Sequence, residues 1–266
     1  MNENDKFVVI KDTDGIRYVS LNRPQKANAL CIQMLGDLRG AFENHAAANI
    51  RMIVLRSTSP KLFCAGGDIE EFVKGPLQLE QQGSGLRELI GAMARCSVPI
   101  LAVARGKAAG AGVILLSMVD IVIAAESLSF TCPEIAFNMY PGIVQVALET
   151  KIGSPRARQL CLSGQALSAS SARDLGLVTD IFPDEDFETA AEKRLAYFTS
   201  RSEALLMARK AWLLSDPAEA IVQRVSMVEH ILHENFHQSG VQDTIKSYLA
   251  QLSSKRNTST PPAVGQ

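Results

Sequence analysis

The chain has 266 residues and a formal net charge of −1, and 47% of its residues are hydrophobic. A chain of this length and composition can bury a complete core, either as one large domain or as a domain with a smaller subdomain. The near-zero net charge excludes a general electrostatic attraction to nucleic acid or to an anionic membrane surface. We therefore expect neither as a partner, and any phosphate group must be bound locally.

Cysteine usage and the N-terminal residues bear on where the protein resides. The five cysteines are odd in number, widely spaced and without a C-x-x-C pair, which is typical of free thiols in a reducing compartment. Residues 1–6 are polar and lack the hydrophobic run of a secretory signal. No uninterrupted apolar stretch is long enough to span a bilayer. These features predict a soluble, cytoplasmic protein.

The first part of the chain alternates between short strands and helices. Residues 7–11 and 16–21 flank Asp14-Gly15, a dipeptide that favours the tight turn of a β-hairpin. Apolar residues then recur at helical spacing over residues 30–44. Further strands are expected at residues 52–55, 100–104 and 120–125, and further helices at residues 86–95 and 106–118. Alternation of this kind predicts βαβ units and a parallel sheet with covered faces.

From Ser154 onward the sequence predicts almost only helices. The expected segments are 154–162, 168–174, 185–198, 202–213 and 216–250, separated by Gly or Pro. Residues 253–266 are rich in Ser, Thr and Pro, with little apolar surface to bury, and we expect them to be disordered. The predicted organisation is an α/β core over residues 1–195, a helical region over residues 196–252 and this tail.

Two glycine-containing turns could bring backbone N–H groups close to a ligand. One is Ala65-Gly66-Gly67-Asp68, directly after a strand, where small residues allow close approach of the backbone. The other, residues 106–112, begins an apolar helix whose first N–H groups lack partners. Two such donors on one oxygen would form an oxyanion hole, which stabilises an enolate. The alternatives are a plain strand-to-helix turn at the first site and tight helix packing at the second.

Glu134 is a third candidate because it is a lone carboxylate among apolar residues. It follows Pro133 and precedes Ile135, Ala136 and Phe137. Burial would raise the pKa of its carboxyl group toward neutrality, which suits proton transfer. The alternative is a surface glutamate in the first turn of a helix, where the helix dipole favours a negative charge.

Taken in order, these motifs resemble those of the crotonase (enoyl-CoA hydratase/isomerase) superfamily. The resemblance rests on A-G-G-D, the G-x-A-x-G-x-G helix start, D-I-V-I-A-A from Asp120, and P-E followed by P-G at Pro141-Gly142. Residues 21–30 are also similar to the family's N-R-P-x-x-x-N-A-L segment, and the similarity spans about residues 7–250. It implies a crotonase-like ββα superhelix core with a helical C-terminal portion that mediates assembly into trimers or dimers of trimers.

The resemblance assigns roles to individual positions. Gly67 and Ala111 match the two residues whose N–H groups form the family's oxyanion hole, and Glu134 matches a catalytic glutamate. Ala111 replaces the usual glycine but keeps the main-chain donor if its φ angle is negative. Expected contacts to the substrate and its CoA part come from Lys26, Ala27, Ala29, Ala65, Asp68, Ile69, Ile114, Pro141 and Gly142.

The position of the family's other glutamate is occupied by Ile114. Hydratases of the family use two carboxylates that share the added water and its proton, and an isoleucine cannot orient water. A single carboxylate can still remove a proton from C2 or C4 of an enoyl thioester and return it elsewhere. The resemblance therefore favours a Δ3,Δ2-enoyl-CoA isomerase, with Glu134 carrying the proton. No cofactor is expected beyond the CoA or phosphopantetheine of the substrate.

Three histidines near the end of the chain, His230, His233 and His237, are spaced to share one helix face. No acidic or cysteine ligand completes a recognisable metal pattern, and we expect no metal there. Residues 233–236 are similar to the C-terminal helix of crotonase-like enzymes of polyketide β-branching and of carboxymethylproline synthases, which implies a catalytic role for His233. The lysine that decarboxylating members carry after the A-G-G turn is not evident.

Two alternatives to the isomerase remain open. One is a biosynthetic enzyme that decarboxylates a CoA or carrier-protein thioester, or directs its enolate to C–C bond formation, with a histidine assisting. The other is a catalytically silent scaffold with the crotonase fold, against which the retained Glu134 speaks. For either enzyme the expected partners are an acyl-CoA or acyl-carrier-protein thioester and further copies of the chain.

Overall fold

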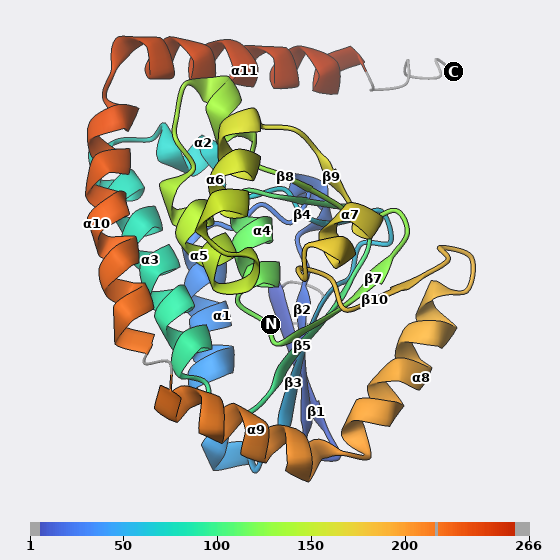
Figure 1. Cartoon of the computed structure of the whole chain (residues 1–266). Coiled ribbons are helices and arrows are strands. Elements are labelled where there is room, and N and C mark those ends of the chain that lie inside the picture. The colour runs from blue at the N-terminus through green and yellow to red at the C-terminus, as the bar shows by residue number, and fades with distance from the viewer. Residues whose placement is uncertain (1–5, 216–217, 259–266) are drawn as a thin grey trace, which may run out of the picture.

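Figure 1 shows the computed structural model, which describes residues 6–215 and 218–258. Its larger sheet has six strands in the order β1 (Val8–Thr13), β2 (Ile16–Leu21), β3 (Met52–Ser57), β5 (Ile100–Ala104), β7 (Ile121–Ala125) and β10 (Asp180–Phe182). Strands β1 and β2 pair antiparallel, and the other neighbours pair in parallel. The hairpin predicted at Asp14-Gly15 is confirmed, and both turn residues have positive φ angles.

The smaller sheet lies at the ends of the larger one and contains the residues that lead into the glycine turns. Its strands are, in order, β4 (Leu62–Cys64), β6 (Lys107–Ala109), β8 (Ser129–Thr131) and β9 (Leu167–Ser168). Each pass of the chain through the larger sheet continues into the smaller one, β3 into β4, β5 into β6 and β7 into β8, before the next helix. The passes therefore form the predicted ββα superhelix.

Helices surround both sheets (Figure 1). Those of the core are α1 (Ile32–Glu43), α2 (Ile69–Phe72), α3 (Pro76–Arg95), α4 (Ala111–Ser117), α5 (Gly142–Ile152), α6 (Ser154–Ser163), α7 (Ala169–Asp174) and α8 (Phe187–Thr199). The C-terminal helices are α9 (Ser202–Ser215), α10 (Ala218–Phe236) and α11 (Ser239–Thr258). Among the described residues, no helix is both long and apolar enough to cross a membrane.

Apolar side chains cover both faces of the larger sheet. On one face Leu35, Leu38 and Phe42 of α1 and the whole of α4 are buried in the main hydrophobic cluster. On the other face Phe187 and Phe198 of α8 pack against strand residues in a second cluster. A sheet buried on both faces explains why its strands read as nearly continuous apolar runs in the sequence.

The helix predicted over residues 86–95 begins earlier, at Pro76. The added residues are mostly polar and include Gly83 and Gly85, so the sequence offered no apolar periodicity there. The helix predicted over residues 106–118 is also shorter than expected. Residues 107–109 form β6, and α4 begins only at Ala111.

The C-terminal portion is helical as predicted, but its divisions differ. The segment expected as one helix over residues 216–250 is two helices, which break before Ser239-Gly240. Helix α11 continues to Thr258, beyond residue 252, where the helical region was expected to end. An established helix gains one hydrogen bond for each residue that it adds, which explains the extension. Residues 259–266 lie outside the described residues, and the expected boundary between 195 and 196 falls inside α8.

Arg209 ties the C-terminal helices to the core. Its guanidinium donates hydrogen bonds to the carbonyl oxygens of Cys96 (2.9 Å) and Met93 (2.8 Å) and to the carboxylate of Asp120 (2.7 Å). The other carboxylate oxygen of Asp120 accepts the N–H of Ile100 at 2.7 Å. The Arg209 side chain is 2% exposed, so α9 is fixed to the end of α3 and to β5 through a buried ion pair.

Replacing Arg209 by Met should lower the free energy of unfolding by about 3 kcal/mol, because Asp120 would lose a buried charged partner. Urea denaturation would measure the change. Lys210→Met is the matched control, since Lys210 is the exposed neighbour on the same helix. Equal unfolding midpoints for the two variants would show that the Arg209 network does not hold α9.

Candidate active site

A pocket with a volume of about 100 Å³ lies where α3, α4, α5 and α10 meet the 3₁₀ helix Pro133–Phe137. Helices α3 and α10 run side by side at this place (Figure 1). Most of the wall is apolar and is formed by Leu30, Leu35, Phe72, Leu79, Leu86, Met139, Ile143, Val144 and Leu232. The polar groups that reach the wall include the backbone of Gly67 and Ala111 and the side chains of Gln82, Glu134 and His233.

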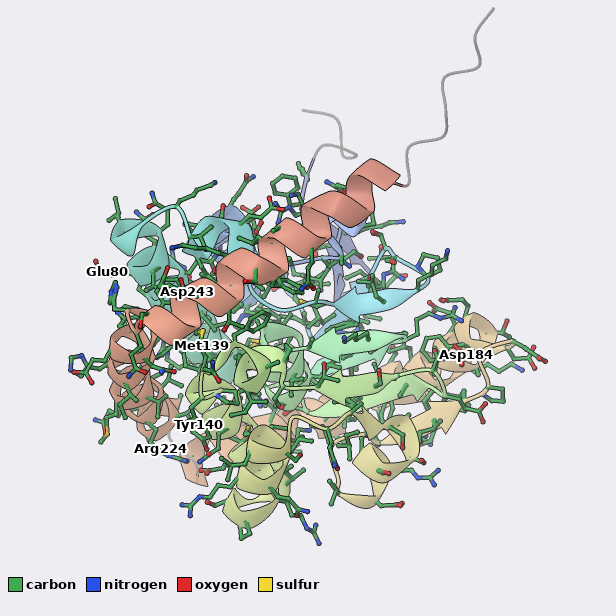
Figure 2. The ribbon with its side chains drawn as sticks, turned by 90° about the horizontal axis from the view of Figure 1, so that it is seen from above. Glu80, Met139, Tyr140, Asp184, Arg224 and Asp243 are labelled. Atoms are coloured by element: carbon green, nitrogen blue, oxygen red, sulfur yellow. The ribbon has the colours of Figure 1, made fainter. Side chains whose placement is uncertain are left out.

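Helix α11 packs near this region. Seen from above, it crosses the molecule beside Met139, while Tyr140 and Arg224 lie further along the same side and Asp184 lies far away (Figure 2). Met139 packs with Val241 of α11 in a small third hydrophobic cluster. The C-terminal helices therefore contribute directly to the surroundings of the pocket.

Gly67 presents an unpaired N–H group. Leu30 donates its N–H to the carbonyl of Gly66 at 2.8 Å and accepts the N–H of Asp68 at 3.0 Å. In such a parallel bridge, successive peptide groups point to opposite sides, so the N–H of Gly67 is directed away from Leu30. It donates to no acceptor within residues 6–215 and 218–258.

The second unpaired donor is Ala111, the first residue of α4, whose N–H has no acceptor in the described chain. Ala111 is helical, so its methyl group does not disturb the backbone donor. The preceding Gly110 has φ +48° and ψ −112°, a conformation that favours glycine. A Cβ atom on Gly66 would lie 3.8 Å from the nitrogen of Ala111. The two turns predicted from the sequence therefore converge.

Glu134 lies against the same two turns. A Cβ atom on Gly110 would stand 2.6 Å from its Oε1 atom, which shows how closely the carboxyl group approaches this turn. The other oxygen, Oε2, is buried and has no hydrogen-bond partner among the described residues. Burial raises the pKa of Glu134 to about 7. At neutral pH this group can therefore either accept or donate a proton.

Ile114 contributes an apolar side chain to the pocket wall. Its side chain is 2% exposed and lies one turn along α4 from Ala111. Among the described residues that line the pocket, Glu134 is the one carboxylic acid. The pocket thus combines two backbone donors, one titratable carboxyl group and an apolar wall.

Of the three C-terminal histidines, the structure brings only His233 to the pocket. His230 is exposed and pairs with Glu234, and His237 lies beyond the end of α10. The Nε2 atom of His233 is buried without a hydrogen-bond partner in the part of the chain that the structure describes. That part also holds no group of three or more His, Cys, Asp or Glu residues arranged for a metal.

Pro141 and Gly142 line the pocket, and the residues predicted to contact CoA make contacts with one another and with nearby residues. Ala65 donates its N–H to the carbonyl of Ala27 at 3.0 Å, and Lys26 pairs with Glu70 at 2.5 Å.

Asp68 and Ile69 have structural contacts of their own. The Asp68 carboxylate pairs with Arg23 at 2.6 Å and accepts the N–H of Glu70, while Ile69 packs against the cluster that contains Met139. Ala29 offers its carbonyl to Arg23 at 2.9 Å. A direct contact of the Asp68 carboxylate with substrate would require breaking this ion pair, and the roles predicted for the whole set stay predictions.

Gln82 is a pocket residue that the sequence did not indicate. It lies in the polar first half of α3, which had no helical periodicity, and is 4% exposed. The burial of its amide could not be predicted without knowing that α3 packs against the Gly66 turn.

Comparison with known proteins bears on the family of this chain. The enoyl-CoA hydratase/isomerase family matches residues 11–256. A probable enoyl-CoA hydratase of Mycobacterium leprae is 29% identical over 252 residues, which cover 94% of this chain and 95% of that protein. The peroxisomal enoyl-CoA delta isomerase 3 of Mus musculus is 27% identical over 210 residues, which cover 77% of this chain and 66% of that protein.

A solved structure shows the same fold. The crystal structure of an enoyl-CoA hydratase from Bacillus halodurans superposes with a TM-score of 0.82 at 19% identity, covering 91% of this chain and 100% of that one. The chain belongs to the enoyl-CoA hydratase/isomerase family. The crotonase-like fold predicted from the sequence is thereby confirmed.

The raised pKa of Glu134 has a consequence for stability. Its folded pKa of about 7 exceeds the ordinary value of 4.5, so the carboxyl group stabilises the folded state below about pH 4.5 and this contribution is lost as the pH rises through 7. Glu134→Gln removes the titration. The free energy of unfolding of the wild type minus that of Glu134→Gln should therefore fall by about 2 to 3 kcal/mol between about pH 5 and about pH 8.

Urea denaturation of both proteins at each pH provides the measurement. A difference that stays constant with pH would mean that Glu134 titrates near its ordinary range and is not desolvated in the pocket.

Proposed function

We propose that the protein isomerises the double bond of an enoyl thioester from the Δ3 to the Δ2 position. The observation that carries the proposal is one buried, titratable carboxyl group, Glu134, in the same pocket as the apolar Ile114, whose position resembles that of the family's other glutamate. The converging N–H groups of Gly67 and Ala111 supply a place for the thioester oxygen. Together these groups support enolate chemistry with one proton carrier.

The proposed reaction needs two proton transfers. The thioester oxygen accepts hydrogen bonds from the N–H groups of Gly67 and Ala111, which stabilise the negative charge that develops on it. The carboxylate of Glu134 removes a proton from C2, and the electrons spread over the oxygen and the C3–C4 bond as a dienolate. The carboxylic acid so formed returns a proton to C4, and the double bond moves to C2–C3. Glu134 ends in its starting state.

Ile114 disfavours hydration at the same site. Addition of water requires a group that orients the water and accepts one of its protons, while a second group protonates the adjoining carbon. An apolar, 2% exposed side chain at position 114 offers no hydrogen bond to that water. The apolar wall of the pocket favours a hydrocarbon chain over water in this region.

The substrate's carrier and the assembly of the protein belong to the same proposal. The thioester is carried by CoA or by the phosphopantetheine of a carrier protein, and Lys26, Ala27, Ala29, Ala65, Asp68 and Ile69 are the residues proposed to contact it. The proposed reaction requires no further cofactor. The predicted homotrimer or hexamer also stays a prediction.

A 3-enoyl-CoA such as 3-hexenoyl-CoA should gain the absorbance of a conjugated enoyl thioester when the protein is added. Glu134→Gln should lower kcat by about 100-fold or more, because it removes the proton carrier. The gain in absorbance measures the rate, and circular dichroism checks that the variant is folded. Retention of full activity by Glu134→Gln would contradict the role given to this residue, and faster hydration than isomerisation by the wild type would contradict the reaction.

His233 supports a second candidate function. Its buried, unpartnered Nε2 atom brings another proton-transferring group to the pocket, which the isomerase mechanism does not use. In a decarboxylase the oxyanion hole would hold the enolate left by loss of CO₂, and an acid would only protonate the product. The histidine would suit that step.

A 3-methylglutaconyl thioester separates the two candidates. If the protein is a decarboxylase, this substrate should release CO₂, and His233→Gln should slow the release by about tenfold or more because an acid group is lost. His230→Gln is the matched control, since His230 lies one turn earlier on α10 and is exposed. Failure to release CO₂ would contradict decarboxylation of this substrate.

A further inference from the structure

The side-chain amide of Gln82 is fixed by two acceptors. Its nitrogen donates to the carbonyl oxygen of Leu30 at 3.1 Å and to the carboxylate of Glu71 at 2.7 Å. Both partners can only accept hydrogen bonds, so the nitrogen of the amide, and not its oxygen, must face them. Gln82 is 4% exposed and lines the pocket.

The Leu30 carbonyl that Gln82 contacts belongs to the bridge that holds Gly67. The same oxygen accepts the N–H of Asp68 at 3.0 Å, and the N–H of Leu30 binds the carbonyl of Gly66 at 2.8 Å. These two bonds lie on either side of Gly67 and set the direction of its free N–H. A shift of the Leu30 peptide would therefore turn this donor.

Glu71 anchors the amide from the other side. The oxygen that accepts from Gln82 also accepts the N–H of Ile32, at the start of α1, at 2.8 Å. This oxygen of Glu71 therefore links α1, through the N–H of Ile32, to α3, through the amide of Gln82. Hydrogen bonds to a charged acceptor are stronger than those between neutral groups, so the amide has little freedom to leave the Leu30 carbonyl.

We infer that Gln82 is a positioning residue for the oxyanion donor at Gly67. Its amide holds the Leu30 peptide, and the Leu30 peptide holds the turn from Gly66 to Asp68 with the N–H of Gly67 directed at the thioester oxygen. The inference rests on the proposed carbonyl site between Gly67 and Ala111, but not on the later proton transfers. Gln82 itself does not need to touch the substrate.

The polarisation of a bound thioester carbonyl provides the test. Crotonyl-CoA labelled with ¹³C at C1 should show a C=O stretch that moves to lower frequency when it binds the wild-type protein, because two N–H donors weaken the bond. Gln82→Met keeps the length of the side chain and removes the donor. We expect it to lose a substantial part of the frequency shift and about tenfold in kcat for 3-hexenoyl-CoA, with a smaller change in KM.

Gln81→Met is the matched control, because Gln81 is the exposed neighbour on the same helix; it should keep both the shift and kcat. If Gln82→Met does not fold, Glu71→Gln is the second variant, since it weakens the hold on the Gln82 amide and should reduce the shift in the same direction. Rescue of the shift by Gln82→Asn, which restores an amide, would add support.

The possible failures are distinguishable. A wild-type complex with no carbonyl shift overturns the oxyanion site, and with it both the proposed function and this inference. A normal shift in the wild type that is unchanged in folded Gln82→Met overturns the role of Gln82 alone. A loss of activity in Gln82→Met with an unchanged carbonyl shift also overturns it. The substitution would then lower activity without changing the polarisation of the thioester carbonyl.

Discussion

The backbones at Gly66 and Gly110 approach each other closely beside the pocket, and both residues have positive φ angles, which favour glycine. A Cβ atom on Gly110 would stand 3.6 Å from the Cα of Gly66 and 2.6 Å from the carboxyl group of Glu134. This close approach brings the free N–H groups of Gly67 and Ala111 to one place and sets Glu134 beside them. The sheets, α4 and the Leu30 bridge all serve to hold the two turns in this contact.

The chemistry of the pocket also depends on the small number of polar groups that lie near the N–H groups of Gly67 and Ala111. Burial raises the pKa of Glu134 to about 7, because no ion pair compensates the loss of water around its carboxyl group. Ile114 leaves the carboxyl group without a second acid as a neighbour. A proton carrier that is half ionised near neutral pH suits a reaction in which one group first accepts a proton and then donates it. His233 is another group in the wall that could transfer a proton.

Much of this arrangement could be predicted from the sequence, because small residues in two turns and a lone carboxylate occur in an order that resembles a known family. Gly67, Ala111 and Glu134 were identified by small residues and a lone carboxylate at family spacing, and the structure brings all three together. Gln82 could not be found in this way, since its helix begins in a polar stretch with two glycines and its role depends on contacts with Leu30 and Glu71, far away in the chain. The Asp68 carboxylate, whose position fits the motif, is paired with Arg23, a contact that the sequence does not indicate.

Enolate formation at the Gly67–Ala111 site is the central claim, and it can be measured without any double bond in the substrate. Butanoyl-CoA incubated with the protein in D₂O can react only by loss and return of a proton at C2. The account predicts deuterium incorporation at C2, detected by mass spectrometry and NMR, at a rate that depends on the ionised form of Glu134. Binding of butanoyl-CoA without any exchange at C2 would contradict the account.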